Sequence, residues 1–341
     1  MIKAALIGLG AMGKGHFHIY KRLMDEGYPV KLVAVCDIDK AKFEEVANSD
    51  TNLEEFKNSK GFSFDGINCY TSVDEMLEKE ELDTVSIVAP TYEHYSITCK
   101  CLKKGIHVLC EKPMATSLEH CRIMIETAKK TGKNFMIGQC LRFQGSYRYL
   151  KDVISKNTFG RVYSAFFYRG GSPTATFWFR NREKGGGALF DQHIHDVDMV
   201  NWLFGLPEKV QCTGVSVMDG SGYDVVSTNY IYPDNIMVNT QNRWIDYDAG
   251  FDFGFRVHFE RGSAICDENG FRVFDEHGNN ITPTGLDESP YYVETKSFLD
   301  AIINKTAVPA ENTPESTMDT IRLALAETQS CDLNGALVDV K

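Results

Sequence analysis

The segment Ile2-Lys3-Ala4-Ala5-Leu6-Ile7-Gly8-Leu9-Gly10-Ala11-Met12-Gly13 decides the fold of the first half of this chain. An apolar run of strand length leads directly into G-x-G-x-x-G, and a helical pattern follows to about residue 26. In this setting the first glycine permits a tight turn, the second lets backbone N–H groups approach a pyrophosphate, and the third allows close helix–strand packing. The motif therefore predicts a dinucleotide site. The alternative is a tight turn in some other α/β fold.

A carboxylate follows the second predicted strand. The apolar run Leu32–Cys36 ends in Asp37, near the spacing of about 20 residues at which an acid holds the adenosine ribose. Such a carboxylate accepts a hydrogen bond from the 2′ hydroxyl and repels a 2′ phosphate, so it favours NAD over NADP. Lys40 and Lys42 lie nearby and could soften that repulsion.

Further apolar runs continue the alternation of strands and helices. They lie at 84–89, 106–110 and 135–138, with a short helix predicted at 73–79. Residues 50–68 are polar, and we expect them to form a helix end and an excursion outside the core. Ligands of open α/β sheets lie at the carboxyl ends of strands, so the residues that follow these runs are candidate site residues.

Three such positions carry polar side chains. Ala89-Pro90-Thr91-Tyr92-Glu93-His94 opens a helix, where His94 either packs or contacts a cofactor. In Glu111-Lys112-Pro113 the proline fixes the direction in which Lys112 leaves its strand. That ammonium could stabilise an alkoxide at the nicotinamide end of the cleft, and a surface salt bridge is the alternative. Arg142 could contact substrate or cofactor, or brace two domains.

The second half has a different texture. Segments rich in Val, Tyr, Phe and Thr are separated by turn signals, and two late helices are predicted at 290–303 and 314–330. The strand-like segments lie at 162–169, 209–218, 225–232, 236–244, 252–259 and 263–266. Runs of strands after a βαβ half predict an antiparallel sheet and an α+β second domain. One face of such a sheet needs a cover, and a second subunit often supplies it.

Within the second half, between the segments 162–169 and 209–218, lies the stretch Gly185-Gly186-Gly187-Ala188-Leu189-Phe190-Asp191-Gln192-His193-Ile194-His195-Asp196-Val197-Asp198. Three glycines can bring the backbone close to a ligand, and a helix is predicted after them. Asp191, His195 and Asp198 then stand at i, i+4 and i+7 on one face. A carboxylate one turn before an imidazole can orient the ring and raise its basicity. An ordinary amphipathic surface helix is the alternative.

Composition narrows the class of protein. With 341 residues, two domains are expected, and the hydrophobic fraction of 43% is that of a globular protein. The net charge of −11 argues against a nucleic-acid or anionic membrane partner. We see no secretory signal and no apolar run of membrane-spanning length. The ten cysteines are scattered, which favours reduced, mostly buried thiols in a cytoplasmic protein.

Together these residues resemble the Gfo/Idh/MocA family, the glucose–fructose oxidoreductase and inositol dehydrogenase group. The resemblance covers nearly the whole chain. It rests on the glycine motif, Pro90-Thr91-x-x-His94, Gly105-x-His107-Val108 before Glu111-Lys112-Pro113, Arg142-Phe143, Trp178, the triple glycine with Asp191, His195 and Asp198, and Phe298. The family fold implies a Rossmann dinucleotide-binding domain and a C-terminal domain with a large, mainly antiparallel open sheet. We place these domains at 1–122 and 123–341.

The resemblance also implies an activity. Family members mostly oxidise a secondary hydroxyl of a sugar or cyclitol, or reduce the ketone, with a nicotinamide cofactor. Carried over, His195 would take the hydroxyl proton, Lys112 would stabilise the oxyanion, and Asp191 would orient the substrate and keep the imidazole basic. Two alternatives stay open: a hydrolase or lyase that oxidises its substrate transiently with bound NAD, and a non-enzymatic dinucleotide-binding sensor. His193, where many relatives carry a small residue, would alter the pocket's polar groups.

The predicted site residues divide into two sets. The cofactor site would comprise Gly8, Gly10, Ala11, Met12, Gly13, Asp37, Ala89, Pro90, Thr91, His94, Glu111, Lys112 and Arg142. The substrate site would comprise Lys112, Trp178, Asp191, Gln192 and His195, and no metal ion is expected. We expect a carbohydrate-like small molecule as substrate, and a homodimer or homotetramer joined through the C-terminal sheets. Loops such as 169–182 would set specificity.

Overall fold

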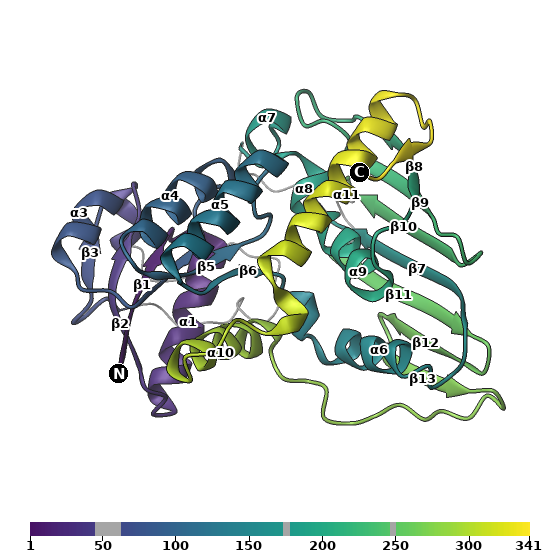
Figure 1. Ribbon diagram of the computed structural model, residues 1–341, viewed down its shortest axis with the longest axis horizontal. Coiled ribbons are helices and arrows are strands. Elements are labelled where there is room, and N and C mark those ends of the chain that lie inside the picture. The colour runs from purple at the N-terminus through teal and green to yellow at the C-terminus, as the bar shows by residue number, and fades with distance from the viewer. Residues whose placement is uncertain (45–62, 173–177, 246–249) are drawn as a thin grey trace. The chain divides into compact units, whose positions relative to one another are not determined.

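The computed structural model describes residues 1–44, 63–172, 178–245 and 250–341 (Figure 1). The contacts of the chain divide it into two compact units. Unit 1 comprises residues 1–115, 119–138 and 291–315, and unit 2 comprises residues 116–118, 139–290 and 316–341. This division differs from the predicted boundary at 122/123, which falls inside helix α5 (Leu118–Thr131). Most of the expected excursion at 50–68 lies outside the described residues.

Unit 1 is built on a six-stranded parallel sheet in the order β3-β2-β1-β4-β5-β6. Its strands are Ile2–Ile7 (β1), Val30–Cys36 (β2), Asn68–Tyr70 (β3), Thr84–Ile87 (β4), His107–Glu111 (β5) and Phe135–Gly138 (β6). Its helices are Ala11–Asp25 (α1), Val73–Lys79 (α3), Thr91–Lys103 (α4), α5 and most of Pro290–Ile303 (α10), with 3₁₀ turns Lys40–Phe43 (η1) and Ala310–Asn312 (η3). The strand order reverses between β1 and β4, as in dinucleotide-binding folds. The predicted Rossmann domain is confirmed.

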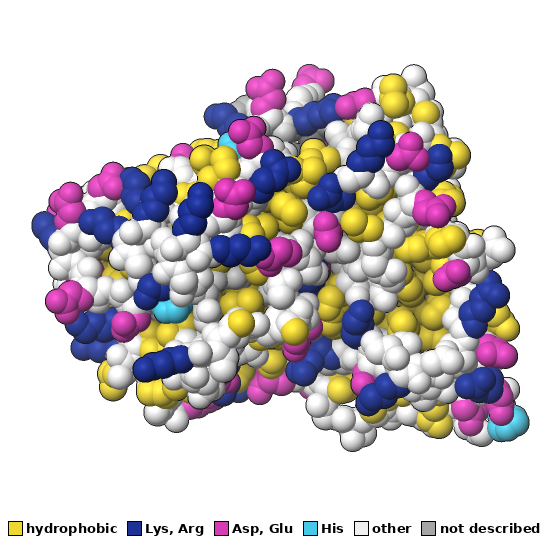
Figure 2. Space-filling model, viewed as in Figure 1, with side chains coloured by type: hydrophobic (Ala, Val, Ile, Leu, Met, Phe, Trp, Pro, Cys, Tyr) yellow, Lys and Arg dark blue, Asp and Glu magenta, His cyan; other side chains and the backbone are white. Residues whose placement is uncertain are grey.

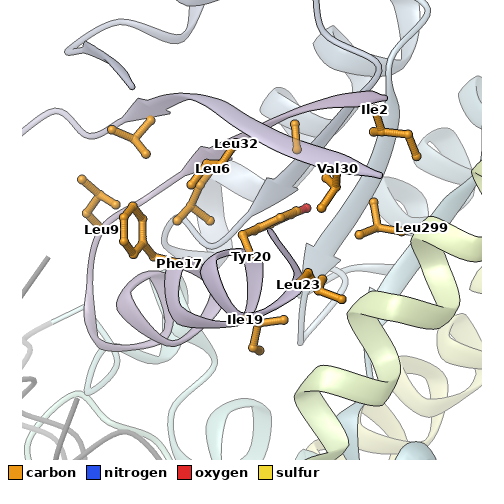
Figure 3. Close-up of a cluster of buried hydrophobic side chains, with 12 residues drawn as sticks. Ile2, Leu6, Leu9, Phe17, Ile19, Tyr20, Leu23, Val30, Leu32 and Leu299 are labelled. Carbon is orange, nitrogen blue, oxygen red and sulfur yellow. The ribbon is translucent and has the colours of Figure 1, made fainter. Parts of the chain in front are cut away.

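The core of unit 1 explains why a late segment of the chain belongs to it. Phe17, Tyr20 and Leu23 of α1 are buried against strands β1 and β2. Leu299 of α10 enters the same cluster, as Figure 3 shows. Each fully buried side chain of this kind contributes about 1.5–3 kcal/mol relative to exposure. Helix α10 was predicted correctly as a helix, but its apolar face completes the first unit.

Unit 2 is built on an eight-stranded sheet in the order β13-β12-β11-β7-β10-β9-β8-β14. Its strands are Val162–Gly170 (β7), Lys209–Val215 (β8), Val225–Ile231 (β9), Met237–Arg243 (β10), Asp252–Phe259 (β11), Gly262–Asp267 (β12), Gly270–Asp275 (β13) and Val338–Asp339 (β14). Strands β7 and β10 pair in parallel, and the other pairs between described strands are antiparallel. The expectation of a mainly antiparallel sheet is confirmed.

The helices of unit 2 pack on one face of this sheet. They are Gly145–Ser155 (α6), Arg182–Gly185 (α7), Ala188–Asp191 (α8), Ile194–Phe204 (α9) and most of Pro314–Asp332 (α11), with the 3₁₀ turn Cys140–Phe143 (η2). Along β9 and β10 buried side chains alternate with exposed or half-buried ones, so among the described residues the opposite face is open. That face mixes apolar residues such as Met237, 61% exposed, with polar ones such as Asn229.

The surface carries both signs of charge. Figure 2 shows acidic and basic side chains interspersed over the face in view. No helix among the described residues is long and apolar enough to cross a membrane. Within the same residues, no cluster of His, Cys, Asp and Glu could hold a metal ion. Eight of the ten cysteines are buried, as the sequence predicts.

Candidate active site

The glycine turn after β1 is shaped by close backbone contacts. Gly8 has φ +99°, and a Cβ there would lie 2.6 Å from the carbonyl oxygen of Val88. A Cβ on Gly13 would lie 2.1 Å from the carbonyl oxygen of Gly8, so helix and turn touch there. A Cβ on Gly10 would meet no atom within 4 Å, and no side chain caps the start of α1. The N-terminus of α1 is thus bordered by open space, which suits a pyrophosphate.

Asp37 is held in place by two backbone groups. Its Oδ2 accepts a hydrogen bond from the N–H of Leu9 at 2.7 Å, and its Oδ1 accepts from the N–H of Asp39 at 2.9 Å. Each carboxylate oxygen keeps a second lone pair, which can accept from a ribose hydroxyl. Beside it Ile38 is 90% exposed, an apolar surface that the sequence analysis overlooked. The residues present fit a dinucleotide with a free 2′ hydroxyl.

The segment that carries Lys112 is anchored by a buried pair. The ring Nε2 of His16, on α1, lies 2.8 Å from Oε1 of Glu111, and both side chains are buried. The other oxygen of Glu111 accepts a hydrogen bond from the backbone N–H of Lys112 at 3.1 Å. Burial alone would raise the pKa of Glu111, but the bond to His16 and the nearby positive charges outweigh it and lower that pKa. Glu111 is therefore a carboxylate that fixes the backbone of Lys112.

His94 lies between the ends of β4 and β5. Its Nδ1 is 2.8 Å from the carbonyl oxygen of Pro113, and its Nε2 is 2.8 Å from that of Ala89. Burial is the largest influence on the pKa of His94 and lowers it, although the two carbonyl groups favour the charged ring. Both ring nitrogens contact backbone, which favours the packing alternative. A cofactor contact by His94 stays a prediction.

In unit 2 the expected single helix over Asp191–Asp198 is wrong. The N–H groups of Gln192 and His193 both bond to the carbonyl of Ala188, at 3.0 and 2.9 Å, and this ends α8. The helical ladder then restarts from the carbonyl of His193, so α9 begins at Ile194. Asp191 is the last residue of the first helix, and His195 is the second residue of the next. Periodicity missed this break because an amphipathic pattern runs through it.

Asp198 stands three residues after His195 on α9, and its side chain belongs to a buried ion pair. It is 1% exposed, and its carboxylate binds the guanidinium of Arg142 at 2.6 and 2.9 Å. Arg142 is fully buried and also donates to Ser316 of α11 at 2.9 Å. This buried pair ties η2 to α9 within unit 2. A cofactor contact by Arg142 stays a prediction.

Of two other predicted residues, Gln192 lies at the break between α8 and α9, and Trp178 lies against Gly185 at the end of α7. The side chain of Gln192 is 7% exposed, and its Oε1 has no hydrogen-bond partner among the described residues. That amide oxygen can accept from a substrate hydroxyl. Trp178 stacks on Phe179, with ring centroids 3.7 Å apart. Residues 173–177, in the loop expected to set specificity, lie outside the described residues.

The expectation for His193 is wrong. Its side chain is fully buried, and its Nε2 lies 3.0 Å from Oε2 of Glu327, also fully buried. A residue so placed belongs to the core of unit 2 and adds no group to a substrate pocket. The sequence misled because His193 stands between two polar candidates, although a buried position fits the spacing to Ile194 and Val197.

Three further residues were missed by the sequence analysis. Arg169 of β7 pairs with Asp196, next to His195, at 3.1 and 3.2 Å, and both are buried. Asn242 of β10 is fully buried, and neither amide atom has a hydrogen-bond partner within the described chain. His16 precedes the middle of α1 and carries no motif. Of these three residues, only Arg169 and Asn242 gave a signal in the sequence, because each is a polar residue within a strand-like run.

The predicted site residues thus fall into two groups. In unit 1 the structure places the glycine turn, Asp37, His94 and Lys112 after the carboxyl ends of β1, β2, β4 and β5, at one edge of the sheet. In unit 2 Asp191, Gln192 and His195 lie together at the break between α8 and α9. A cavity of about 260 Å³ beside α8 is lined by other residues, including Arg182, Phe190 and Tyr223. That Lys112 acts together with Asp191 and His195 stays a prediction.

Two models of one family match this chain. The model described as an oxidoreductase family with an NAD-binding Rossmann fold matches residues 2–139, and the GFO/IDH/MocA C-terminal domain matches residues 147–265. The chain belongs to the Gfo/Idh/MocA family. The predicted family and the NAD-binding domain are confirmed.

Known relatives of this family member differ in what their names state. A 2,7-anhydro-N-acetylneuraminate hydratase of Mediterraneibacter gnavus is 31% identical over 240 residues, which span 67% of this chain and 59% of the hydratase. An inositol 2-dehydrogenase of an Arthrobacter species is 25% identical, over 89% of this chain and 86% of the relative. The solved structure of a levoglucosan dehydrogenase with NADH and levoglucosan has a TM-score of 0.82 at 18% identity, and 99% of each chain is covered. At that identity the likeness concerns the fold.

Proposed function

We propose that this protein is an NAD-dependent oxidoreductase that acts on a secondary hydroxyl, or the corresponding ketone, of a sugar, cyclitol or related polyol. The observation that carries the proposal is the fixed position of Lys112. Its backbone is bonded to the buried Glu111 carboxylate, at the same sheet edge as the glycine turn and Asp37. A cationic side chain held at the cofactor edge suits the stabilisation of an alkoxide.

The proposed mechanism assigns one task to each catalytic side chain. His195 removes the hydroxyl proton as general base. Lys112 donates a hydrogen bond to the oxygen and stabilises its developing negative charge. Asp191 orients the substrate and keeps the imidazole basic. The glycine turn and Asp37 would hold NAD, which would supply the acceptor for the hydride of the carbinol carbon. The ketone leaves as product, and the proton remains on His195 until it passes to water.

A second function has a specific observation in its favour. The relative from Mediterraneibacter gnavus is named as a hydratase, although it shares the family fold. The same constellation could oxidise its substrate transiently, allow hydrolysis or elimination, and return the hydride. No net NADH would then accumulate. The sensor alternative is weaker, because a sensor needs no proton acceptor and this chain has Lys112, Asp191 and His195.

The test is a substrate screen with NADH absorbance as the readout. The purified protein is incubated with NAD and one candidate substrate at a time. The candidates are myo-inositol, scyllo-inositol, levoglucosan and a broader panel of sugars and anhydrosugars. We expect net NADH formation with at least one polyol. Product formation detected by mass spectrometry without net NADH would favour the transient-oxidation alternative. Tight NAD binding with no turnover of any panel member would favour the sensor.

We also propose that a second copy of this chain covers the open sheet face, as a homodimer or homotetramer. The exposed side chains of Met237, Ile231 and Phe166 on that face support this proposal. Light scattering at micromolar concentration should give two or four times the mass of the chain. Met237→Lys should shift the mass toward that of one chain. A wild-type protein that is monomeric at this concentration would count against the proposal.

A further inference from the structure

A closed polar cluster lies inside unit 2, directly behind the break between α8 and α9. His193 and Glu327 are 3.0 Å apart, and the hydroxyl of Tyr230 donates to the other oxygen of Glu327 at 2.6 Å. Thr240 lies 2.9 Å from the Tyr230 hydroxyl and 3.4 Å from Nε2 of His193. All four side chains are at most 2% exposed.

The hydrogen bonds of this cluster have one consistent direction. Burial, with Glu327 nearby, raises the pKa of Tyr230 well above its usual value. The phenol therefore keeps its proton and donates a hydrogen bond to Glu327. Thr240 must then donate to the Tyr230 oxygen, and Nε2–H of His193 donates to the second oxygen of Glu327. Nδ1 of His193 has no hydrogen-bond partner among the described residues. The geometry therefore fits the tautomer with its proton on Nε2.

Stability alone is a poor reason for such a cluster. A buried ion or carboxylate network loses much of its solvation, and replacement by well-packed apolar residues is often neutral or stabilising. What apolar residues lack is direction: a hydrogen-bonded ring fixes where each member points. We therefore expect the cluster to orient a neighbouring segment of the chain.

The segment it fixes is the turn that carries the predicted catalytic residues. The N–H of His193 ends α8 at the carbonyl of Ala188, and its own carbonyl accepts the first bonds of α9 from Asp196 and Val197, at 2.9 and 3.1 Å. Asp191 lies two residues before this pivot and His195 two residues after it. The other members of the cluster come from β9, β10 and α11, so three elements of unit 2 hold one residue of the turn.

We propose that His193 is a positioning residue: its bond to Glu327 sets the orientation of the turn, and with it the direction of the His195 imidazole. The inference rests on the proposed function, in which His195 is the general base. It predicts that the cluster governs turnover without touching substrate or cofactor. A misplacement of about 1 Å in a catalytic group can lower a rate roughly a hundredfold.

The decisive variant keeps the fold stable and removes the hydrogen bonds that orient the turn. His193→Leu, Glu327→Met and Tyr230→Phe together replace the cluster by apolar side chains of similar size. We expect this triple variant to fold, with a thermal midpoint near that of wild type. His193→Gln is the conservative companion, because its amide can still donate to Glu327. Ser330→Ala is the matched control: Ser330 is buried on the same helix as Glu327 and bonds to Cys212 on β8 at 2.8 Å, away from the turn.

The primary readout does not depend on any substrate. Proteins with isotope-labelled histidine are examined by NMR, and the His195 ring signal is assigned by its loss in His195→Gln. We expect the triple variant to shift or broaden the His195 signal and to leave the His16 and His94 signals of unit 1 in place. His193→Gln should restore most of the wild-type position, and Ser330→Ala should keep it. An unchanged His195 signal in the folded triple variant would overturn the proposal.

Turnover provides the second readout, with the polyol that the screen identifies. We expect kcat of the triple variant to fall roughly tenfold to a hundredfold, with the KM for NAD unchanged. If the His195 signal moves but turnover does not, the positioning holds and the proposed role of His195 fails. If the triple variant does not fold, Glu327→Gln is measured in the same way, and an unmoved His195 signal there contradicts the inference equally.

Discussion

A buried histidine–glutamate pair lies beside each half of the predicted catalytic group, and the two pairs are built in opposite ways. In unit 1 the glutamate is the neighbour of the catalytic residue: Glu111 precedes Lys112, and His16 reaches it from α1 at 2.8 Å. In unit 2 the histidine is the neighbour: His193 lies between Asp191 and His195, and Glu327 reaches it from α11 at 3.0 Å.

The difference lies in how directly each pair acts. Glu111 accepts a hydrogen bond from the backbone N–H of Lys112. Loss of the Glu111 charge therefore affects the position of Lys112 directly. His193 acts through the turn, because its backbone ends one helix and starts the next. The pair in unit 1 thus fixes the backbone position of one residue, whereas the pair in unit 2 fixes the orientation of a turn. Substitutions in the two regions should therefore separate cofactor-edge effects from proton-transfer effects.

The largest expected effect concerns the proton acceptor of unit 2. His195→Ala should lower kcat by roughly a hundredfold or more, the usual size of a general-base contribution. The affinity for NAD should hardly change, since the predicted adenosine and pyrophosphate contacts lie in unit 1. Steady-state kinetics and NAD titration measure both quantities. His277→Ala, at an exposed histidine after β13, is the control. Turnover near that of wild type would leave Lys112 as the better candidate base.

On the unit 1 side, Lys112→Ala should lower kcat by about a hundredfold, the effect of losing one donor to a developing oxyanion. A modest loss of NAD affinity should accompany it, because Lys112 lies at the cofactor edge. Lys103→Ala on α4 is the exposed control. If Lys112→Ala weakened only NAD binding and left kcat intact, the lysine would be a cofactor ligand without a catalytic task.

A change confined to cofactor choice sharpens the comparison, since it should not reach unit 2. Asp37→Ser with Ile38→Arg removes the carboxylate and adds a positive charge beside it. The ratio of kcat/KM with NAD to that with NADP should fall on the order of tenfold, because a 2′ phosphate is no longer repelled. The substrate KM should stay unchanged. Tighter binding of NADP than of NAD by the wild-type protein would show that Lys40 and Lys42 outweigh Asp37.

The smallest expected effect is on stability and depends on pH. The folded-state pKa of Glu111 lies below its usual value of 4.5, so this carboxylate adds stability above that pH and loses it as the pH falls through the folded value. Glu111→Gln should therefore reduce the free energy of unfolding by about 1–3 kcal/mol at neutral pH. The difference from wild type should shrink below pH 4.5, as urea titrations can measure. A difference that persists unchanged in acid would mean that Glu111 is not stabilised as a carboxylate.

Five of the six strands of the first unit could be predicted from the sequence, whereas the three-residue edge strand β3 was missed. A glycine turn after an apolar strand has few alternatives, and the clash of 2.1 Å that a Cβ on Gly13 would make shows why. Asp37 and Lys112 follow strand ends, whose position parallel pairing determines. Helix α10 could be recognised as a helix, but its place in unit 1 depends on packing of Leu299 against residues almost 300 positions earlier in the chain.

In the second unit the pattern predicted six of the eight strands, missed β13 and β14, and did not show the local structure around His195. The amphipathic spacing through Asp191 and His195 continues across the break, which is made by two N–H groups that share the carbonyl of Ala188. The roles of Asp198 and His193 depend on Arg142 and Glu327, which the fold brings to them from distant parts of the sequence. Buried partners of this kind leave no local signal in a single sequence.

We propose that Lys112 of unit 1 and His195 of unit 2 act on one substrate hydroxyl, and a crystal structure of the ternary complex would test this claim. The complex would contain NADH and the polyol that the screen identifies. We expect Nζ of Lys112 and a ring nitrogen of His195 both to lie about 2.6–3.2 Å from the same hydroxyl oxygen. The carbon that bears this oxygen should lie about 3–3.5 Å from the reactive carbon of the nicotinamide. A complex in which His195 contacts no substrate oxygen, or in which Lys112 contacts a different one, would contradict the claim.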